Sequence, residues 1–224
     1  MSRTRKLAGG GRAVEVEPER VAGWFARFAE RHGGIARSTV EPGFVRVEAA
    51  DGAIAGTTVP FGPLVPPPDS RLAVDVLVLH LMKPRRIGLV LVRLGGHSIG
   101  IAYDGRIEAS RTDRRLVHGR SAAGGWSQHR FARRREGQAR QALQAAAADA
   151  YELLAPRLSE LDGVVLGGDQ RALDELRADR RLAPVFDMAE PRVLDVPEPR
   201  RTVLDEAAQR ARCVEITIVD GQSR

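Results

Sequence analysis

One segment of the chain, from Arg86 to Leu94 (RIGLVLVRL), is almost continuously apolar and has the composition of a strand buried on both faces. Two glycines, Gly95 and Gly96, follow it, and a second apolar run extends from Ser98 to Tyr103 before the turn dipeptide Asp104-Gly105. A further strand pair is expected at Ile107 to Thr112 and Arg115 to His118. These consecutive hairpin strands predict the antiparallel part of a sheet.

The region after residue 119 alternates between helical and strand patterns. A long helix is predicted from Gln128 to about Leu154, where Pro156 ends it. The patterns that follow predict a strand over Gly163 to Gly167, a helix over Gln170 to Arg180, short strands around Val185 and Val193, a helix over Thr202 to Arg212 and a last strand over Val214 to Val219. This alternation predicts an α/β fold with a mixed sheet flanked by helices.

The first part of the chain is organised differently. Residues 1–12 are charged and glycine-rich, so we expect a flexible tail. A helix is expected after Pro18, and a hairpin around Asp51-Gly52 is expected to join strands at Phe44 to Ala49 and Ala53 to Val59. The prolines that follow form a stiff connector, which places a boundary near residues 60–82. We therefore predict a small α+β annex over residues 13–82 and a larger domain over residues 83–224.

Composition excludes several classes of protein. The chain of 224 residues contains one cysteine, Cys213, so it forms no intramolecular disulfide and no multi-cysteine zinc site, which fits a reducing compartment. No apolar stretch is long enough for a signal peptide or a membrane span. We therefore expect a soluble, cytoplasmic protein that does not contact membranes. Large coiled-coil and sheet-edge signals are absent, so the oligomeric state stays open and a monomer is favoured.

The motifs of several enzyme classes are absent as well. No Gly-Lys-Ser/Thr phosphate loop and no G-x-S-x-G elbow occurs, and no two histidines stand three or four residues apart as metal ligands on a helix. Gly167-Gly168-Asp169 is interpreted as a tight turn between a strand and a helix. We expect neither a metal nor a cofactor.

Positive charge is concentrated in one segment. The chain has 35 basic and 29 acidic residues, a net charge of +6, whereas residues 111–140 alone contain nine arginines and two acidic residues, a balance of +7. On a helical wheel Arg130, Arg133, Arg134 and Arg140 share one side of the predicted helix, and small apolar residues share the other. This pattern indicates contact with a polyanion such as RNA, with a solvated surface as the alternative.

The sequence GGWSQ, from Gly124 to Gln128, directly precedes this arginine-bearing segment. Adjacent glycines adopt backbone angles closed to other residues and let the chain lie against a ligand. The Gln128 carboxamide has donors and an acceptor but is no base at neutral pH. Such a group is suited to orienting a water molecule or stabilising an oxyanion.

The stretch GGWSQHRFARRR (Gly124 to Arg135) resembles the GGQ loop and following helix in the central domain of eukaryotic and archaeal class I peptide-release factors. It is most similar to the Vms-type release-factor-like family and, within it, to the actinobacterial peptidyl-tRNA hydrolase group. Gly163 to Gly168 resembles a later strand and turn of that domain, and the order of elements agrees over about residues 84–220. Trp126 stands where termination factors have glutamine, and Gln128 lies two residues further on, as in the displaced motif of Vms-type members.

The resemblance implies a release-factor central-domain-like, RNase H-like fold and a peptidyl-tRNA hydrolase that frees nascent chains from stalled large ribosomal subunits during ribosome-associated quality control. Its catalytic residues would be Gly124, Gly125 and Gln128. Its partners would be the large ribosomal subunit and peptidyl-tRNA. The RNA-binding residues would be Arg120, Trp126, Arg130, Arg133, Arg134 and Arg140.

Several alternatives stay open. Relatives in eukaryotes are associated with cutting tRNA near its 3′ end, so a tRNA endonuclease of the same family is the nearest rival. The protein would otherwise be a non-catalytic ribosome-binding or RNA-binding module. Trp126 either stacks on a base or docks on its own domain, His129 is the one proton-transfer candidate beside the loop, and Ser127 is interpreted as the helix N-cap.

Overall fold

The structure is a computed structural model that describes residues 4–7, 10–64, 73–93, 95–114 and 126–221, and the side chains of residues 114–136 lie outside this description. The chain divides into two compact units. The first consists of residues 1–84 and 212–224, and the second consists of residues 85–211. The second unit is therefore inserted into the sequence of the first. Among the described residues, no helix combines the length and the apolar character that crossing a membrane requires.

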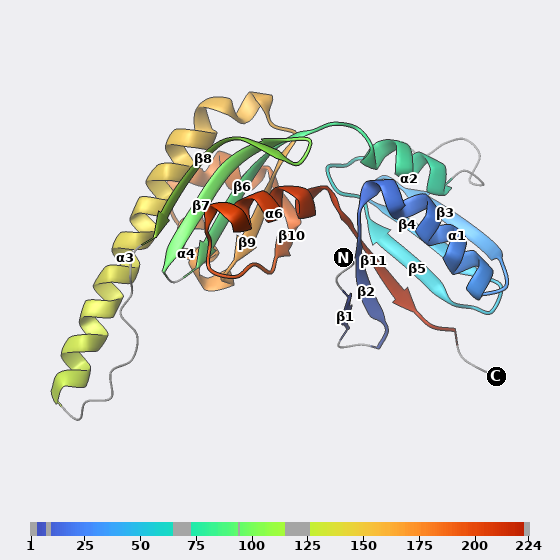
Figure 1. The fold of residues 1–224 in the computed structure, drawn as a ribbon, viewed down its shortest axis with the longest axis horizontal. Helices are drawn as coiled ribbons and strands as arrows, with labels where there is room; N and C mark the ends of the chain where they lie inside the picture. Colours follow the sequence, from blue (N-terminus) through green and yellow to red (C-terminus); the bar gives the residue numbers. More distant parts are fainter. Residues whose placement is uncertain (1–3, 8–9, 65–72, 94, 115–125, 222–224) are drawn as a thin grey trace. The chain divides into compact units, whose positions relative to one another are not determined.

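The first unit contains a six-stranded sheet in which all neighbouring strands are antiparallel, in the order β1-β2-β11-β5-β4-β3 (Figure 1). Its strands are β1 (Thr4–Lys6), β2 (Arg12–Val16), β3 (Ile35–Glu41), β4 (Phe44–Ala49), β5 (Ile54–Thr58) and β11 (Val214–Val219). The expected hairpin is confirmed, because β4 pairs with β5 across the turn that contains Asp51 and Gly52. Gly52 has a φ of 84°, which a glycine adopts without strain.

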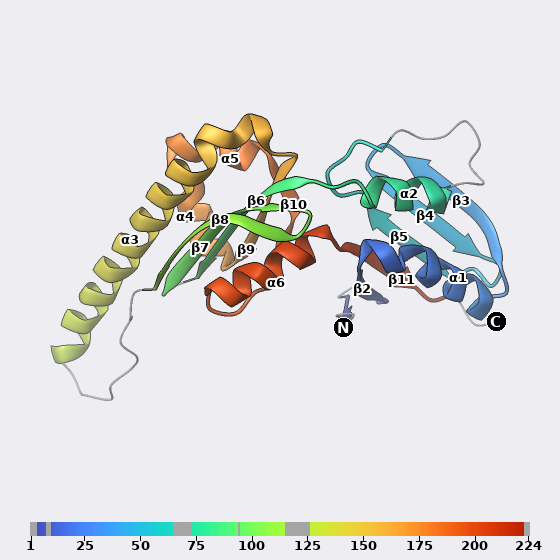
Figure 2. The same cartoon turned by 45° about the horizontal axis from the view of Figure 1, so that its top comes forward.

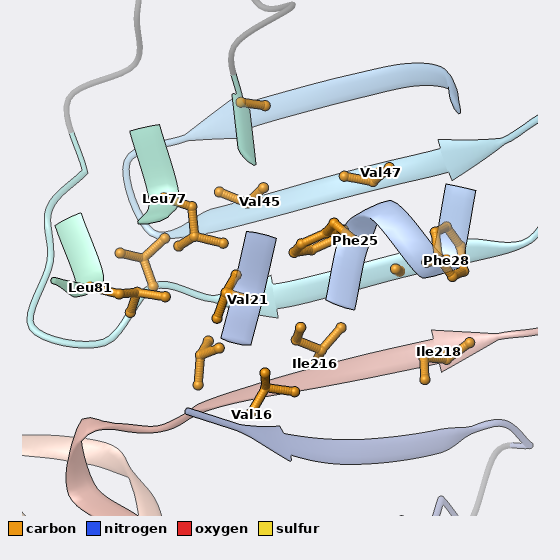
Figure 3. Packing of buried hydrophobic residues seen from close by; sticks show 14 of the residues in the cluster. Val16, Val21, Phe25, Phe28, Val45, Val47, Leu77, Leu81, Ile216 and Ile218 are labelled. Atoms are coloured by element: carbon orange, nitrogen blue, oxygen red, sulfur yellow. The ribbon is translucent and has the colours of Figure 1, made fainter. Parts of the chain in front are cut away.

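Two helices, α1 (Val21–Arg31) and α2 (Ala73–Leu81), pack against one face of this sheet (Figure 3). The spacing of Val21, Phe25 and Phe28 places all three on one side of α1, and all three are buried. They meet Leu77 of α2 and alternate strand residues such as Val45 and Ile216. The annex is thus α+β, as its sequence pattern predicts.

Three features of the first unit differ from expectation. Residues Thr4–Lys6 pair with β2, so this part of the expected flexible tail is a strand. Helix α2 lies in the region that was expected to be only a connector. Strand β11 was expected in the larger domain, but it lies between β2 and β5, where Ile216 and Ile218 enter the core of the first unit. The larger domain therefore ends near residue 211 rather than at residue 224.

The second unit contains a five-stranded mixed sheet in the order β10-β9-β6-β7-β8. Its strands are β6 (Arg86–Arg93), β7 (Gly96–Tyr103), β8 (Arg106–Arg114), β9 (Gly163–Gly168) and β10 (Ala189–Leu194). Strands β6, β9 and β10 are parallel, and β6, β7 and β8 form the expected antiparallel hairpins. This arrangement confirms the predicted mixed α/β fold.

Helices cover both faces of this sheet (Figure 2). They are α3 (Trp126–Leu154), α4 (Gln170–Arg177), α5 (Ala183–Asp187) and α6 (Arg201–Arg212). On one face Val90 and Ile99 pack with Ala146 and Ala150 of α3. On the other face α6 approaches so closely that a Cβ atom at Gly100 of β7 would lie 2.9 Å from Leu204 Cδ2.

Smaller differences concern element boundaries. Val185 was expected in a strand but lies in α5, where Pro184 occupies one of the first helical positions, which proline favours. Helix α4 ends at Arg177, three residues before the expected end. The strand expected at Arg115 to His118 lies outside the described residues.

Candidate active site

The segment expected to be catalytic connects β8 to α3. Strand β8 ends at Arg114 and α3 begins at Trp126. Arg120, Gly124 and Gly125 lie between them, outside the described residues. Trp126 is the first residue of α3 and Gln128 is the third. Ser127 therefore lies inside the first turn, and the N-cap position assigned to it from the sequence is not the one it occupies.

The arginines predicted to bind RNA occupy one side of α3. Arg133 and Arg134 lie three and four positions after Arg130, and Arg140 lies seven positions after Arg133, which places the four on one side of the helix. Arg140 is exposed and forms no ion pair with any residue whose side chain the structure describes. Gln128 lies eighteen residues, or five turns, before the buried Ala146 and has the same angular position. The helix therefore places Gln128 and the arginines at opposite angular positions.

Among the residues of α3 whose side chains the structure describes, those that pack on the sheet lie in its second half. Ala142 is the first buried residue of the described part, and Ala146, Ala150 and Leu154 continue the buried stripe that the sequence predicts. In both views the first half of the helix extends beyond the ends of β7 and β8 (Figures 1 and 2). At 1.5 Å per residue, Trp126 lies about 24 Å along the helix axis from Ala142. The Gly-Gly sequence thus immediately precedes the far end of a projecting helix.

A polar cluster joins the packed half of α3 to the sheet. His97 Nε2 of β7 lies 2.8 Å from Asp149 Oδ2, and Arg111 Nη1 of β8 donates to Asp149 Oδ1 at 3.0 Å. Arg111 also donates to Glu152, one turn further along α3. His97 is 1% exposed. We call His97, Arg111, Asp149 and Glu152 the helix anchor.

The electrostatics of the helix anchor follow from its bonds. Partial burial raises the pKa of Asp149, but the hydrogen bonds from His97 and Arg111 outweigh burial and hold the pKa below its usual value. The bonds to Glu152 and Asp149 raise the pKa of Arg111. Arg111 was counted in the basic segment, yet its charge is matched by these two carboxylates. Arg111 therefore does not contribute a free positive charge to the basic segment.

Sequence reasoning missed the helix anchor. Its members are separated by 52 and 38 positions in the chain, so no local motif connects them. One signal was available: Asp149 and Glu152 are acidic residues, three positions apart, in the otherwise apolar half of the helix. Acidic residues on the side of a helix that packs on a sheet favour a basic partner on the facing strands.

The Gly167-Gly168-Asp169 turn is structural, as interpreted. Gly168 has a φ of 108°, and a Cβ atom there would collide with the carbonyl oxygen of Val92. The Asp169 carboxylate accepts hydrogen bonds from the N–H groups of Arg171 and Ala172 and caps α4. This carboxylate occupies the place where a bound phosphate would lie. Among the described residues, no group of three or more His, Cys, Asp and Glu side chains is arranged to hold a metal ion.

A mixed sheet between helices, with a long helix that follows a Gly-Gly sequence and bears arginines in its projecting half, has the arrangement of a release-factor-like domain. Residues 85–217 match the family described as Actinobacteria/chloroflexi VLRF1 release factor. This match covers more than half of the chain, so the chain belongs to that family. The membership expected from the sequence is confirmed.

Other comparisons give more distant likenesses. No curated protein matches the chain. The archaeal translation termination factor aRF1 is 15% identical, with a TM-score of 0.44, over 89% of this chain and 66% of that one. Dom34 of S. cerevisiae, described as a translation termination-like factor involved in RNA quality control pathways and interacting with Hbs1, is 8% identical, with a TM-score of 0.34, over 91% of this chain and 65% of that one. Pelota of Archaeoglobus fulgidus is 14% identical, with a TM-score of 0.31, over 94% and 67%. The chain spans just under two thirds of the length of aRF1 and of Dom34.

Proposed function

We propose that the protein is a cytoplasmic peptidyl-tRNA hydrolase that frees nascent chains from tRNA on stalled large ribosomal subunits, as part of ribosome-associated quality control. The observation that carries this proposal is the placement of α3. The helix begins at Trp126, directly after Gly124 and Gly125, and extends about 24 Å beyond Ala142, its first buried residue among those whose side chains the structure describes. Because the start of α3 lies this far from the packed part of the helix, it can enter an enclosed site that is too narrow for the rest of the domain. Membership of a release-factor family supports the same reaction.

The chemistry assigned to the tip is ester hydrolysis. Gly124 and Gly125 let the backbone approach the terminal adenosine of the tRNA. The Gln128 carboxamide orients a water molecule toward the ester carbonyl and donates to the oxyanion that develops there. The water oxygen bonds to the acyl carbon, the bond from that carbon to the ribose oxygen breaks, and the water supplies a proton to the ribose oxygen.

The arginines have a separate role in this proposal. Arg130, Arg133, Arg134 and Arg140, together with Arg120, contact RNA phosphates, which gives affinity without selecting a base sequence. Gln128 is on the opposite side of the helix. The arginines therefore bind RNA on one side, while Gln128 contacts the ester bond of peptidyl-tRNA on the other. Trp126, at the helix start, stacks on a base. A monomer suffices for this arrangement.

The test is peptide release from purified large subunits that carry peptidyl-tRNA. Gln128→Ala is expected to lower the release rate about 100-fold, which is typical for the loss of one such donor, without changing binding to the subunit. Gln141→Ala removes an exposed amide from the same helix and is the matched control, with release unchanged. Equal release by both variants would remove Gln128 from the mechanism.

The 3′ end of the tRNA reports which bond is cut. Sequencing that end after the reaction is expected to show an intact CCA terminus, because ester hydrolysis leaves the tRNA whole. A shortened end would indicate the tRNA endonuclease instead. Binding to the subunit without any release would indicate a non-catalytic ribosome-binding module.

A further inference from the structure

Most of the fully buried side chains by which α3 packs on the sheet are small. The buried stripe consists of Ala142, Ala146, Ala147 and Ala150 and ends at Leu154. The fit between two surfaces depends on side-chain ridges that enter grooves. Methyl groups form shallow ridges, so an alanine stripe allows the helix to rotate and slide with little loss of contact. Leu154 and the partly buried Leu143 and Leu153 add larger contacts, but the alanine stripe itself fixes the direction of α3 weakly.

The helix anchor supplies directional bonds at the same interface. Asp149 accepts from His97 on β7 through one oxygen and from Arg111 on β8 through the other. Hydrogen bonds of 2.8 and 3.0 Å weaken steeply when their angle changes. Because the two donors come from different strands, a rotation of the helix that preserves one bond distorts the other. The anchor thus fixes the orientation that the alanine stripe leaves loose.

Small errors at the anchor become large at the tip. Asp149 lies 23 residues from Trp126, which corresponds to about 35 Å along the helix. A tilt of about 10° at the anchor moves Trp126 by about 6 Å, and a tilt of about 2° moves it by about 1 Å. In catalysis a displacement of about 1 Å lowers rates by as much as about 100-fold. The angle of the helix therefore has to be held to within a few degrees.

We propose that His97, Arg111 and Asp149 are positioning residues, which set the direction of α3 and thereby deliver the GG-x-x-Q segment to its substrate. Their effect on catalysis rests on the proposed function, whereas their effect on the direction of α3 does not. None of them touches the substrate in this proposal. Their loss is therefore expected to lower kcat more than it changes KM, because the RNA-binding arginines are retained and phosphate contacts depend less on exact geometry than the alignment of the reacting atoms does.

The direction of α3 can be measured without activity. Spin labels at Gly137→Cys on α3 and Ala178→Cys after α4, in a Cys213→Ala background, report a distance within the second unit by pulsed electron resonance. Both positions are exposed, and the space around Gly137 is open. Gly137 lies about 18 Å from Asp149, so a tilt of about 10° changes its position by about 3 Å.

Asp149→Ala and His97→Leu are expected to shift or broaden the distance distribution by about 3 Å. His97→Gln keeps a donor near the position of Nε2 and is expected to restore the wild-type distribution. Asp205→Ala, which removes an exposed ion pair with Arg201 on α6, is the matched control and leaves the distribution unchanged. Thermal unfolding of each variant verifies that it is folded. A distribution that stays within about 1 Å of wild type in both Asp149→Ala and His97→Leu overturns the proposal.

The release assay tests the consequence for catalysis. Asp149→Ala is expected to lower kcat at least tenfold and to change KM less than threefold, with His97→Gln close to wild type. An unchanged kcat in a variant with a broadened distribution would overturn the link between helix direction and catalysis. If the wild-type protein releases no peptide, the proposed function fails, and the distance measurement still decides whether the anchor directs α3.

Discussion

Neutralising the projecting arginines should change how binding to the large ribosomal subunit depends on salt. The perturbation is Arg130→Gln, Arg133→Gln and Arg134→Gln in one protein, all on one side of α3 and all beyond its packed half. Each phosphate contact releases counterions, so the logarithm of the binding constant falls against the logarithm of salt concentration by about 0.7 to 0.9 per contact. Loss of three contacts should therefore reduce the slope by about 2 to 2.7.

The difference in slope can be measured as a ratio of the losses in binding of the two proteins. Between 50 and 200 mM salt, a fourfold increase, wild-type binding should weaken about 16- to 40-fold more than binding of the triple variant. Co-sedimentation with purified large subunits, or fluorescence anisotropy of labelled protein, measures both constants across this range.

A matched variant separates local contact from total charge. Arg171, Arg177 and Arg180 are exposed in α4 and the turn after it, and replacing all three with glutamine removes the same charge from the same unit. This control should retain the wild-type slope. Equal slopes for the two triple variants, or a slope unchanged by the α3 substitutions, would refute phosphate contact by these arginines.

Two further predictions concern stability. Gly168→Ala should lower the free energy of unfolding by about 2 to 4 kcal/mol, because its φ of 108° is strained for alanine and the new Cβ meets the Val92 carbonyl. Urea unfolding measures this, and Gly137→Ala, which enters open space in a helix, should instead stabilise the protein by up to about 1 kcal/mol; equal effects of the two changes would contradict the argument. The lowered pKa of Asp149 adds stability that is present above its unfolded pKa and is lost as the pH falls below about 4. The difference in unfolding free energy between wild type and Asp149→Asn should therefore be full at pH 7 and shrink between pH 4 and pH 2, and a difference that is constant with pH would contradict it.

Local signals predicted the second unit well. Its hairpin strands and the long helix are specified by residues close in sequence, because turn dipeptides and hydrophobic periodicity act within a few positions. Val185 was the exception, since a β-branched residue indicated a strand while the adjacent Pro184 favoured a helix start.

Non-local pairing limited the prediction of the first unit. Strand β11 pairs with β5, whose residues lie more than 150 positions earlier, and its alternating Val214, Ile216 and Ile218 fit either domain equally well. Nothing in a strand's own sequence states which sheet it completes. The helix anchor was missed for the same reason, because Asp149 and His97 become neighbours only when α3 packs on β7.

The distribution of charged residues along α3 is the opposite of the one that stabilises an isolated helix. The acidic residues of one half and the basic residues of the other have different explanations. A helix favours acidic residues near its start and basic residues near its end, because its backbone dipole is positive at the start. In α3 the five arginines lie at positions 130–140, and the second half contains two acidic residues and no basic ones. In the packed half the two carboxylates pair with His97 and Arg111 of the sheet. Their position near the end of the helix is explained by these contacts. In the projecting half, the repulsion among guanidinium groups three or four residues apart is offset when a polyanion lies beside them. The reversed charge distribution of this one helix therefore accounts both for how it is fixed to the domain and for the RNA that we propose it meets.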